Sequence, residues 1–341
     1  MTRRALVLCP GRGSYSRSEL GTLVDRESTF LDVFDAHRAA LGRPTVRELD
    51  AAERYSARMH IAGEHASILT AGYTLSDVEQ IDAERFDVVG VCGNSMGWYT
   101  ALVAAGALSA EDGARLVETM GAFQAGNVIG GQLLYPVTDE DWRPDPTLQD
   151  AVDRVVAGNP DLHWSIRLGG QAVLGGSDAA LKAATAQLPA LERGAARFPL
   201  KLPLHSAFHT PLLVTTRHNA GPALDALDWR SPRTPLVDGQ GSVWAAEWGD
   251  PDGIRDWTLG DQVDCCFDFS TMVETALGEL GPDVVILPGP GSNLGGAVAQ
   301  VMIRLGWQGI DSKAAFLARQ ASDPIVLAMG RPDQRPLVVR G

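Results

Sequence analysis

The amino-acid sequence predicts an α/β fold, in which a parallel sheet covered by helices carries an inserted subdomain with a different order of elements. Two observations lead to this prediction. Short apolar runs, which are typical of buried parallel strands, recur along the chain with helical patterns between them. From residue 128 to residue 198 the pattern changes to a β-α-β-β-α order. The chain has 341 residues, which is long enough for a large domain with such an insertion.

Charge and composition narrow the classes of function. The chain has 29 basic and 42 acidic residues and a formal net charge of −13. Phosphate binding needs positive charge, so nucleic acid and anionic membranes are poor partners. The chain has neither an apolar run long enough to span a membrane nor a secretory signal at its start. Its four cysteines show no metal-binding spacing. We therefore expect a cytoplasmic protein with reduced thiols and no metal site.

The first predicted strand, Ala5–Cys9, leads into a glycine-bearing loop, Pro10–Ser14. This loop has two interpretations: an ordinary turn, or a segment that lends a backbone N–H to an active site. Helical patterns follow across residues 18–40 and 56–72, with apolar residues spaced as on one face of a helix. They connect the loop to the next strand.

The stretch FDVVGVCGNSMGWYT, residues 86–100, carries the clearest chemical signal. An apolar strand ends in Gly93-Asn-Ser-Met-Gly97, and a helical pattern follows. This is the context of a nucleophile elbow, in which a sharp turn exposes a serine at the positive end of a helix. Glycine at both ends lets the two backbones approach closely. The alternative is an ordinary glycine-rich turn, but the flanking strand and helix favour Ser95 as a nucleophile and the Met96 N–H as an oxyanion donor.

The inserted subdomain follows the helix that begins after Ser109. Its predicted elements are a strand at 130–137, a helix at 146–157, a hairpin of 163–168 and 171–174, and a helix at 178–188. This order is that of a ferredoxin-like unit. The expected domains are a core of residues 1–127 and 199–305, a ferredoxin-like subdomain of residues 128–198, and a C-terminal extension of residues 306–341.

The core resumes after the insertion, with strands expected at 234–237 and 284–287 and a helix at 293–305. An activated serine needs a base within hydrogen-bond reach. Five of the seven histidines lie in helical or strand patterns, where a structural role is usual. His205 and His209 instead lie in a short loop, Pro203–Pro211, that precedes a helix. His209 stands at the start of that helix and is the candidate base, although spacing alone does not pair it with Ser95.

Three separated pieces of the sequence resemble one enzyme family. They are Pro10-Gly-Arg-Gly-Ser14, Gly93-Asn-Ser-Met-Gly97 and Ser206-Ala-Phe-His-Thr-Pro211. The malonyl-CoA:acyl carrier protein transacylase family, the acyltransferases of fatty-acid and polyketide biosynthesis, shows a PGQGSQ-like loop, a GHSxG elbow and a GAFHTP-like loop in this order. Residues 99–113, 169–173 and 289–291 are also similar, so the resemblance spans about residues 5–305. It implies an α/β-hydrolase-like parallel-sheet core with an inserted ferredoxin-like subdomain.

The resemblance also implies a reaction. Ser95 would attack an acyl thioester with His209 as base, and the backbone N–H groups of Met96 and Arg12 would stabilise the intermediate. The phosphopantetheine thiol of an acyl carrier protein would then take the acyl group from Ser95. The coenzyme A thioester and phosphopantetheine are substrates, and no cofactor is bound permanently. In the family a backbone or amide oxygen orients the histidine, and here Asp238 replaces the nearby asparagine as the candidate for that role.

The helix after the elbow departs from the family. Malonyl-transferring members have an arginine within an LVxxRG pattern that pairs with the malonyl carboxylate, and here the pattern is Leu116-Val-Glu-Thr-Met-Gly121. Burying a carboxylate beside Met120 instead of a cation costs several kcal/mol. We therefore expect an acyl group without a free carboxylate. Arg12, at the family's glutamine position, is an alternative cation for a malonyl group, and it could equally bind coenzyme A phosphate or face solvent.

Two further positions are expected to contact substrate together with Met120 and Arg12. Phe208 resembles the residue of members that take unbranched acyl units. Asn94 replaces the common histidine before the nucleophile and keeps a side chain that forms hydrogen bonds.

Other functions remain open at this point. Relatives of this fold act as acyl hydrolases that clear stalled acyl groups from carrier proteins, and they too lack the arginine. A non-catalytic carrier-binding module is a third interpretation, against which the retained Ser95 and His209 argue. The segment 193–224 contains Arg193, Arg197, Lys201 and Arg217 and no acidic residue. It is either a docking surface for an acidic carrier protein or an ordinary solvated face.

Overall fold

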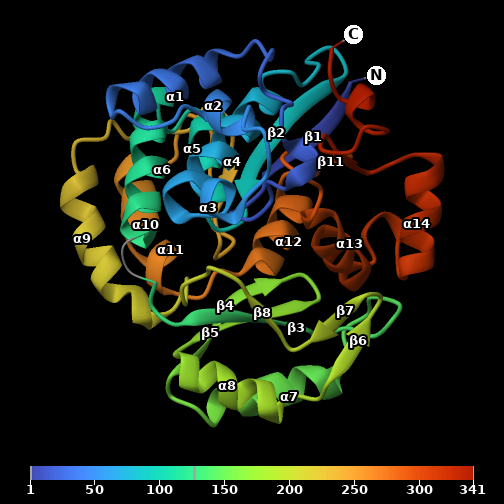
Figure 1. Cartoon of the computed structure of the whole chain (residues 1–341). Coiled ribbons are helices and arrows are strands. Elements are labelled where there is room, and N and C mark those ends of the chain that lie inside the picture. The colour runs from blue at the N-terminus through green and yellow to red at the C-terminus, as the bar shows by residue number, and fades with distance from the viewer. Residues whose placement is uncertain (1, 126–127, 341) are drawn as a thin grey trace.

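A six-stranded sheet forms the centre of the molecule in the computed structural model, which describes residues 2–125 and 128–340 (Figure 1). Its strands are β1 (Arg3–Cys9), β2 (Phe86–Gly93), β9 (Leu236–Val237), β10 (Val243–Trp244), β11 (Val284–Leu287) and β12 (Val326–Ala328). They lie in the order β10-β9-β2-β1-β11-β12. All neighbours are parallel except the edge pair β10-β9, which is antiparallel. The predicted α/β class with a parallel-sheet core is confirmed.

The register of the central strands places two loops side by side. Residues 5–9 of β1 are fully buried, as expected for a strand covered on both faces. In the parallel pair β1-β2, Cys9 is opposite Gly93. The loop after β1 and the turn after β2 therefore leave the sheet at the same carboxyl edge, where ligands bind in open α/β sheets.

The helices of the large body lie in two groups around this sheet. In Figure 1, α1, α4, α5 and α6 lie on one side of β1 and β2, and α12, α13 and α14 lie on the other. The helices are α1 (Thr29–Ala40), α2 (Val46–Asp50), α3 (Ala57–His60), α4 (Gly63–Val78), α5 (Gly97–Ala104), α6 (Ala110–Ala125), α9 (Val214–Leu224), α10 (Pro251–Leu259), α11 (Asp261–Asp264), α12 (Phe269–Glu279), α13 (Leu294–Leu305) and α14 (Lys313–Ser322). Among the described residues, no helix has both the length and the apolarity needed to cross a bilayer.

A second, four-stranded sheet packs below the large body. It consists of β3 (Gly131–Pro136), β4 (Leu162–Leu168), β5 (Gln171–Gly176) and β8 (Leu200–Leu202), with α7 (Pro146–Ala157) and α8 (Asp178–Gln187) on its outer face (Figure 1). The strands lie in the order β4-β5-β3-β8 and every pair is antiparallel. This is the β-α-β-β-α order predicted for the insertion, completed by β8. A short hairpin of β6 (Leu191–Arg193) and β7 (Ala196–Phe198) precedes β8.

The two faces of the small sheet serve different cores. Along β3, Leu133 and Tyr135 pack with α7 and α8, whereas Leu134 faces the large body. This is the two-residue alternation of a strand. In β4 the alternation is broken, because the pairing with β5 shifts between Trp164 and Ile166. The bulge leaves Trp164 on the helix side and turns Ile166 toward the large body.

The predicted division of the chain stays a prediction, and three features bear on it. The boundary at residue 127 lies outside the described residues. Strand β8 belongs to the small sheet although it lies after the predicted boundary at 198. Strand β12, within the predicted C-terminal extension, pairs in parallel with β11 and so completes the large sheet.

Candidate active site

The turn after β2 has the geometry of a nucleophile elbow. Ser95 has a φ of 55°, in the left-handed region that a non-glycine residue rarely adopts. The two glycines of the turn are needed for space. A Cβ on Gly93 would lie 2.1 Å from the Gly97 carbonyl oxygen, and a Cβ on Gly97 would lie 2.4 Å from the Cys9 carbonyl oxygen. The sequence therefore folds β2 tightly onto α5 and leaves Ser95 at the tip.

Ser95 lies against His209, the residue that the family resemblance implied as its base and that spacing alone did not pair with it. The distance from Ser95 Oγ to His209 Nε2 is 2.7 Å. On the other side of the ring, His209 Nδ1 lies 2.6 Å from the backbone oxygen of Gln262. A carbonyl oxygen only accepts, so Nδ1 carries the proton and Nε2 is left as the acceptor. This tautomer is the one that can take the proton of Ser95.

The environment of His209 keeps its ring neutral. The residue is 4% exposed, and burial lowers its pKa to about 4, while the hydrogen bond to Gln262 opposes that shift. Burial acts in this direction because it disfavours the charged imidazolium. His209 is therefore unprotonated at neutral pH and able to act as a base.

Gln262, which the sequence analysis did not single out, holds both members of the pair. Its backbone oxygen orients His209, and its side-chain Nε2 donates to the backbone oxygen of Ser95 at 3.1 Å. Its Oε1 accepts from the Tyr99 hydroxyl at 2.8 Å. Every residue type has a backbone oxygen, so the contact of Gln262 with His209 cannot be predicted from the identity of the residue, and no sequence signal would have identified this position.

The proposed orienting role of Asp238 is wrong. Its carboxylate accepts hydrogen bonds from the backbone of Gln240 and Ser242 and from the Trp244 indole, at 2.9 to 3.0 Å. These bonds close the turn between β9 and β10. The oxygen that faces His209 Nδ1 is instead the backbone oxygen of Gln262.

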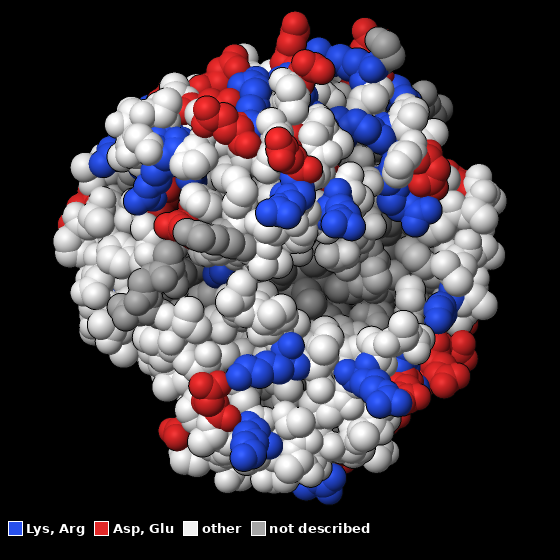
Figure 2. Space-filling model, in the orientation of Figure 1, with Lys and Arg blue, Asp and Glu red and all other residues white. Residues whose placement is uncertain are grey.

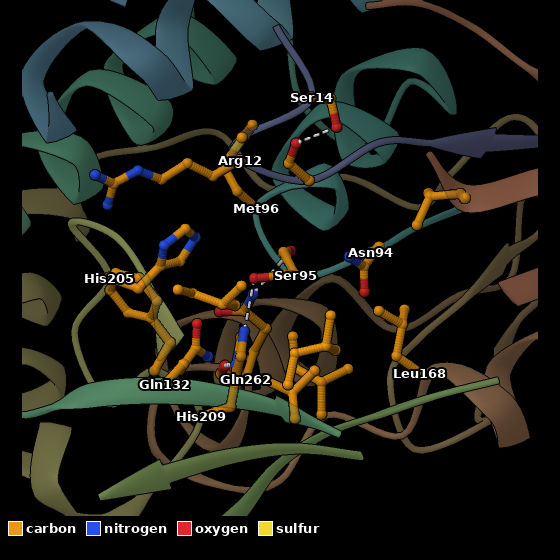
Figure 3. A pocket seen from close by; sticks show the side chains of 18 of the residues that line it. Arg12, Ser14, Asn94, Ser95, Met96, Gln132, Leu168, His205, His209 and Gln262 are labelled. Carbon is orange, nitrogen blue, oxygen red and sulfur yellow. Dashed lines mark hydrogen bonds between the residues drawn. The ribbon is translucent and has the colours of Figure 1, made fainter. Parts of the chain in front are cut away.

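The two predicted oxyanion donors lie beside Ser95. The Met96 N–H belongs to the start of α5, where backbone amides have no acceptor within the helix. The loop that carries Arg12 packs directly on the elbow, because a Cβ on Gly11 would lie 2.7 Å from the Asn94 oxygen. The Ser14 hydroxyl donates to the Gly11 oxygen at 2.8 Å and fixes the loop (Figure 3). Their role in binding an oxyanion stays a prediction.

A cavity of about 300 Å³ opens at Ser95, and it is lined by all the predicted catalytic, oxyanion-hole and substrate-contacting residues. Figure 2 shows the face of the molecule hollowed between the large body and the small sheet, with Lys and Arg on both sides of the hollow. The small sheet supplies one wall, from Gln132, Leu134, Ile166, Leu168, Val173 and Leu202. Among the described lining residues there is no Asp or Glu. The cavity is therefore suited to a largely apolar group.

The predicted substrate-contacting residues occupy different parts of this cavity. Met120 lines it from α6 and is 2% exposed, and Phe208 lines it next to His209. In Figure 3, Asn94 and Leu168 lie on one side of Ser95, and Arg12 and His205 lie on the other. Oδ1 of Asn94 is buried and has no hydrogen-bond partner among the described residues.

The Arg12 side chain is tied to the protein. Its Nη2 donates to the backbone oxygens of Ile61, at 3.0 Å, and Leu204, at 3.2 Å. The guanidinium carbon lies 5.7 Å from the centre of the Phe208 ring. Burial lowers the Arg12 pKa from its usual value. Two carbonyl oxygens thus already accept hydrogen bonds from the guanidinium of Arg12, which lines the cavity and is partly exposed.

The basic residues of segment 193–224 do not form a surface of unbalanced charge. Each one pairs with an acidic residue from outside the segment: Arg193 with Glu140, Arg197 with Glu192, Lys201 with Asp178, and Arg217 with Asp261 and Asp264. Apart from Asp264, these acidic side chains are about half exposed or more, so the pairs are screened by water. Carrier-protein docking at this segment stays a prediction, and the pairing favours the alternative of a solvated face.

Comparisons with known proteins agree with the predicted resemblance. No family model matches the chain. The malonyl CoA-acyl carrier protein transacylase of Bacillus subtilis is 28% identical over 229 residues, which cover 65% of this chain and 69% of that protein. The structure of the Synechocystis malonyl-CoA:ACP transacylase covers 98% of this chain and all of its own, with a TM-score of 0.75 and 16% identity. A type II polyketide malonyl-transacylase solved with its acyl-carrier protein covers 88% of this chain and 93% of its own, with a TM-score of 0.69 and 20% identity.

Proposed function

Because the curated homologues of this chain are malonyl-CoA:acyl carrier protein transacylases, whose fold it shares, we propose that it is an acyltransferase that acts through Ser95. It moves an acyl group from acyl-CoA or an acyl carrier protein to the phosphopantetheine thiol of a carrier protein. The observation that carries the proposal is the chain of contacts from Ser95 Oγ through His209 to the Gln262 backbone oxygen. The reaction needs no permanently bound cofactor, since coenzyme A and phosphopantetheine are substrates. We place the protein in the cytoplasm, in keeping with its free cysteines.

The proposed first half-reaction loads Ser95. As Ser95 Oγ attacks the thioester carbonyl, its proton passes to His209 Nε2, and the N–H groups of Met96 and Arg12 bind the oxyanion. The C–S bond then breaks, and His209 returns the proton to the departing thiolate. The products are free coenzyme A and acyl-Ser95. In the second half, the same steps run with the carrier thiol as nucleophile, and Ser95 recovers its proton.

The proposed acyl group carries no free carboxylate. Met120 lies where the resemblance implies a cation, and its side chain lines the cavity. A desolvated carboxylate there would have a thioether as its neighbour, and an unpaired buried charge is costly. Among the described residues that line the cavity, Arg12 is the one Lys or Arg, and two backbone oxygens already accept hydrogen bonds from its guanidinium. An acyl hydrolase is a second candidate function. Water would take the acyl group from Ser95 in place of the carrier thiol, and the same Ser95 and His209 would serve that reaction.

Intact-mass spectrometry of the purified protein tests the proposal. It is incubated with acetyl-, butyryl- and malonyl-CoA, and a phosphopantetheinylated carrier protein is then added. A stable adduct on Ser95 that moves to the carrier is the expected result, with malonyl-CoA the poorest donor. An adduct that returns to free enzyme and free acid before the carrier is added would make the protein a hydrolase. Loading by malonyl-CoA alone would assign a carboxylate-binding role to Arg12.

A further inference from the structure

One polar side chain stands in the wall that the small sheet gives to the cavity. Gln132 lies on β3, on the face that Leu134 shares, and only 2% of it is exposed. Its Nε2 lies 2.6 Å from Ser165 Oγ, and Ser165 Oγ lies 2.7 Å from the backbone oxygen of Phe208. Ser165 is the residue at the bulge of β4 and is fully buried. The three groups therefore form one short chain of hydrogen bonds behind the cavity wall.

This chain determines which end of the Gln132 amide faces the cavity. The Phe208 carbonyl only accepts, so the Ser165 hydroxyl donates to it. The one proton of that hydroxyl is then used, and Ser165 Oγ accepts from a Gln132 N–H. The other atom of the amide, Oε1, is left free of protein donors among the described residues. Figure 3 shows the Gln132 side chain rising from the sheet with its amide directed into the cavity.

A second acceptor faces the same region. His205 Nδ1 lies 2.9 Å from the backbone oxygen of Pro203, so Nδ1 carries the proton and Nε2 accepts. Its ring lines the cavity and lies 6.0 Å from the Phe208 ring. Arg12, on the same side of Ser95, adds a positive charge. The positive charge of Arg12 disfavours an ammonium group, while the lone pairs of the two neutral acceptors repel a carboxylate and favour a neutral donor.

We propose that the acyl group transferred by this protein carries a hydroxyl group, which donates a hydrogen bond to Gln132 Oε1. The substrate class is a hydroxyacyl thioester. This inference rests on the proposed acyltransferase function and specifies its substrate. A plain alkyl chain that fills this part of the cavity would displace water from the Gln132 amide oxygen and offer it no donor, and a site built around a hydrogen-bonding group rejects analogues that lack the partner.

Competition between acyl-CoAs tests the inference. The protein is offered equal amounts of butyryl-CoA and one of 2-, 3- or 4-hydroxybutyryl-CoA, and the initial ratio of the two Ser95 adducts is measured by intact mass. At least one hydroxybutyryl ester should load about tenfold faster than butyryl. In Gln132→Met, which keeps the length of the side chain but removes the acceptor, the ratio should fall to about one. Because both adducts form on the same molecules, a partly unfolded variant does not change the ratio.

Two further variants separate the amide oxygen from general packing. Ser165→Ala leaves Gln132 in place but releases its amide, so the preference should fall without vanishing. Gln171→Met makes the same substitution on the neighbouring strand, outside this cavity, and should keep the wild-type ratio. If butyryl-CoA loads and no hydroxybutyryl ester is preferred, the hydroxyacyl inference is overturned while the acyltransferase stands. If no acyl-CoA loads Ser95, the acyltransferase itself fails. An unchanged ratio in Gln132→Met would overturn the assignment to Gln132.

Discussion

The elbow and the small-sheet wall of the cavity are built on opposite principles. At the elbow, hydrogen bonds within the protein hold each reacting group in place. Ser95 is bonded to His209, and His209 is bonded to the backbone oxygen of Gln262. The side-chain amide of Gln262 is bonded in turn to the Ser95 backbone and the Tyr99 hydroxyl. The wall is apolar except where Gln132 directs an amide oxygen into the space. The catalytic residues are thus hydrogen-bonded to one another without substrate. The Gln132 amide oxygen, in contrast, has no donor among the described residues and can accept a hydrogen bond from a substrate. Chemistry and selectivity are therefore separable by mutation.

Removing the nucleophile should have the largest effect. In Ser95→Ala no oxygen remains to form an ester, so the covalent adduct should disappear for every acyl-CoA. Intact-mass spectrometry after incubation with butyryl-CoA measures this directly. An adduct of undiminished yield would show that another residue is the nucleophile. Thermal unfolding at the wild-type temperature would confirm that the elbow still folds.

Removing the base should slow acylation without changing which acyl group is chosen. His209→Ala leaves Ser95 with no group to take its proton, and a positioned base contributes about 10²–10⁴-fold. Stopped incubations with butyryl-CoA give the rate, and competition between two acyl-CoAs gives the selectivity. A loss of less than tenfold would point to another base. A change of selectivity equal to the change in rate would contradict the separation of the two regions.

Met120, which lines the acyl cavity from α6, should affect selectivity rather than the rate of the chemical step. Met120→Arg adds a cation to the cavity, where a carboxylate would otherwise be buried unpaired, so malonyl loading should rise relative to acetyl loading by about tenfold or more. The acetyl rate itself should change much less. Met120→Leu is the matched control, because it keeps the volume and adds no charge. An unchanged malonyl-to-acetyl ratio would mean that position 120 does not contact the acyl group.

Mutation of Gln262 tests whether Ser95 and His209 need the hydrogen bonds of the Gln262 side chain. Gln262→Ala keeps the backbone oxygen that orients His209 but leaves the Ser95 carbonyl and the Tyr99 hydroxyl without their partner. Each buried group left unpaired costs about 1–3 kcal/mol, so both stability and the acylation rate should fall. Tyr99→Phe removes only the outer bond and should retain most of the rate. The Asp238 carboxylate closes the turn between β9 and β10 and, within the described part of the chain, forms no hydrogen bond with Ser95 or His209, so Asp238→Asn should change the rate much less than Gln262→Ala.

The same contrast explains what the sequence could predict. Ser95, His209 and the order of strands and helices are marked by local signals: a glycine-flanked turn, a loop histidine before a helix, and runs of apolar residues. Gln262 acts through its backbone and Gln132 through a bond to a bulge residue on another strand, and neither has a local signature. A glutamine in the otherwise apolar segment at 131–136 was the one visible hint. Asp238 was assigned from its place in the sequence alone, and its bonds close a turn instead.

The pH dependence of acylation should show the smallest change, and the absence of change is the informative result. Burial lowers the pKa of His209 to about 4, so the ring stays unprotonated as the pH falls from 7 to 5, and the rate of Ser95 acylation should fall by less than about twofold. A solvated histidine with an ordinary pKa would lose most of its base form over this range.

The same lowered pKa of His209 determines how the stability of the protein changes with pH. The unfolded chain takes up a proton on this histidine near its ordinary pKa while the folded protein does not, so His209 lowers stability progressively from about pH 6.5 to pH 4. Initial rates of adduct formation at constant ionic strength, with unfolding followed in parallel, separate the two effects. A rate that halves near pH 6.5 while the protein remains folded would show that His209 is open to water, and would contradict the closed arrangement at the elbow.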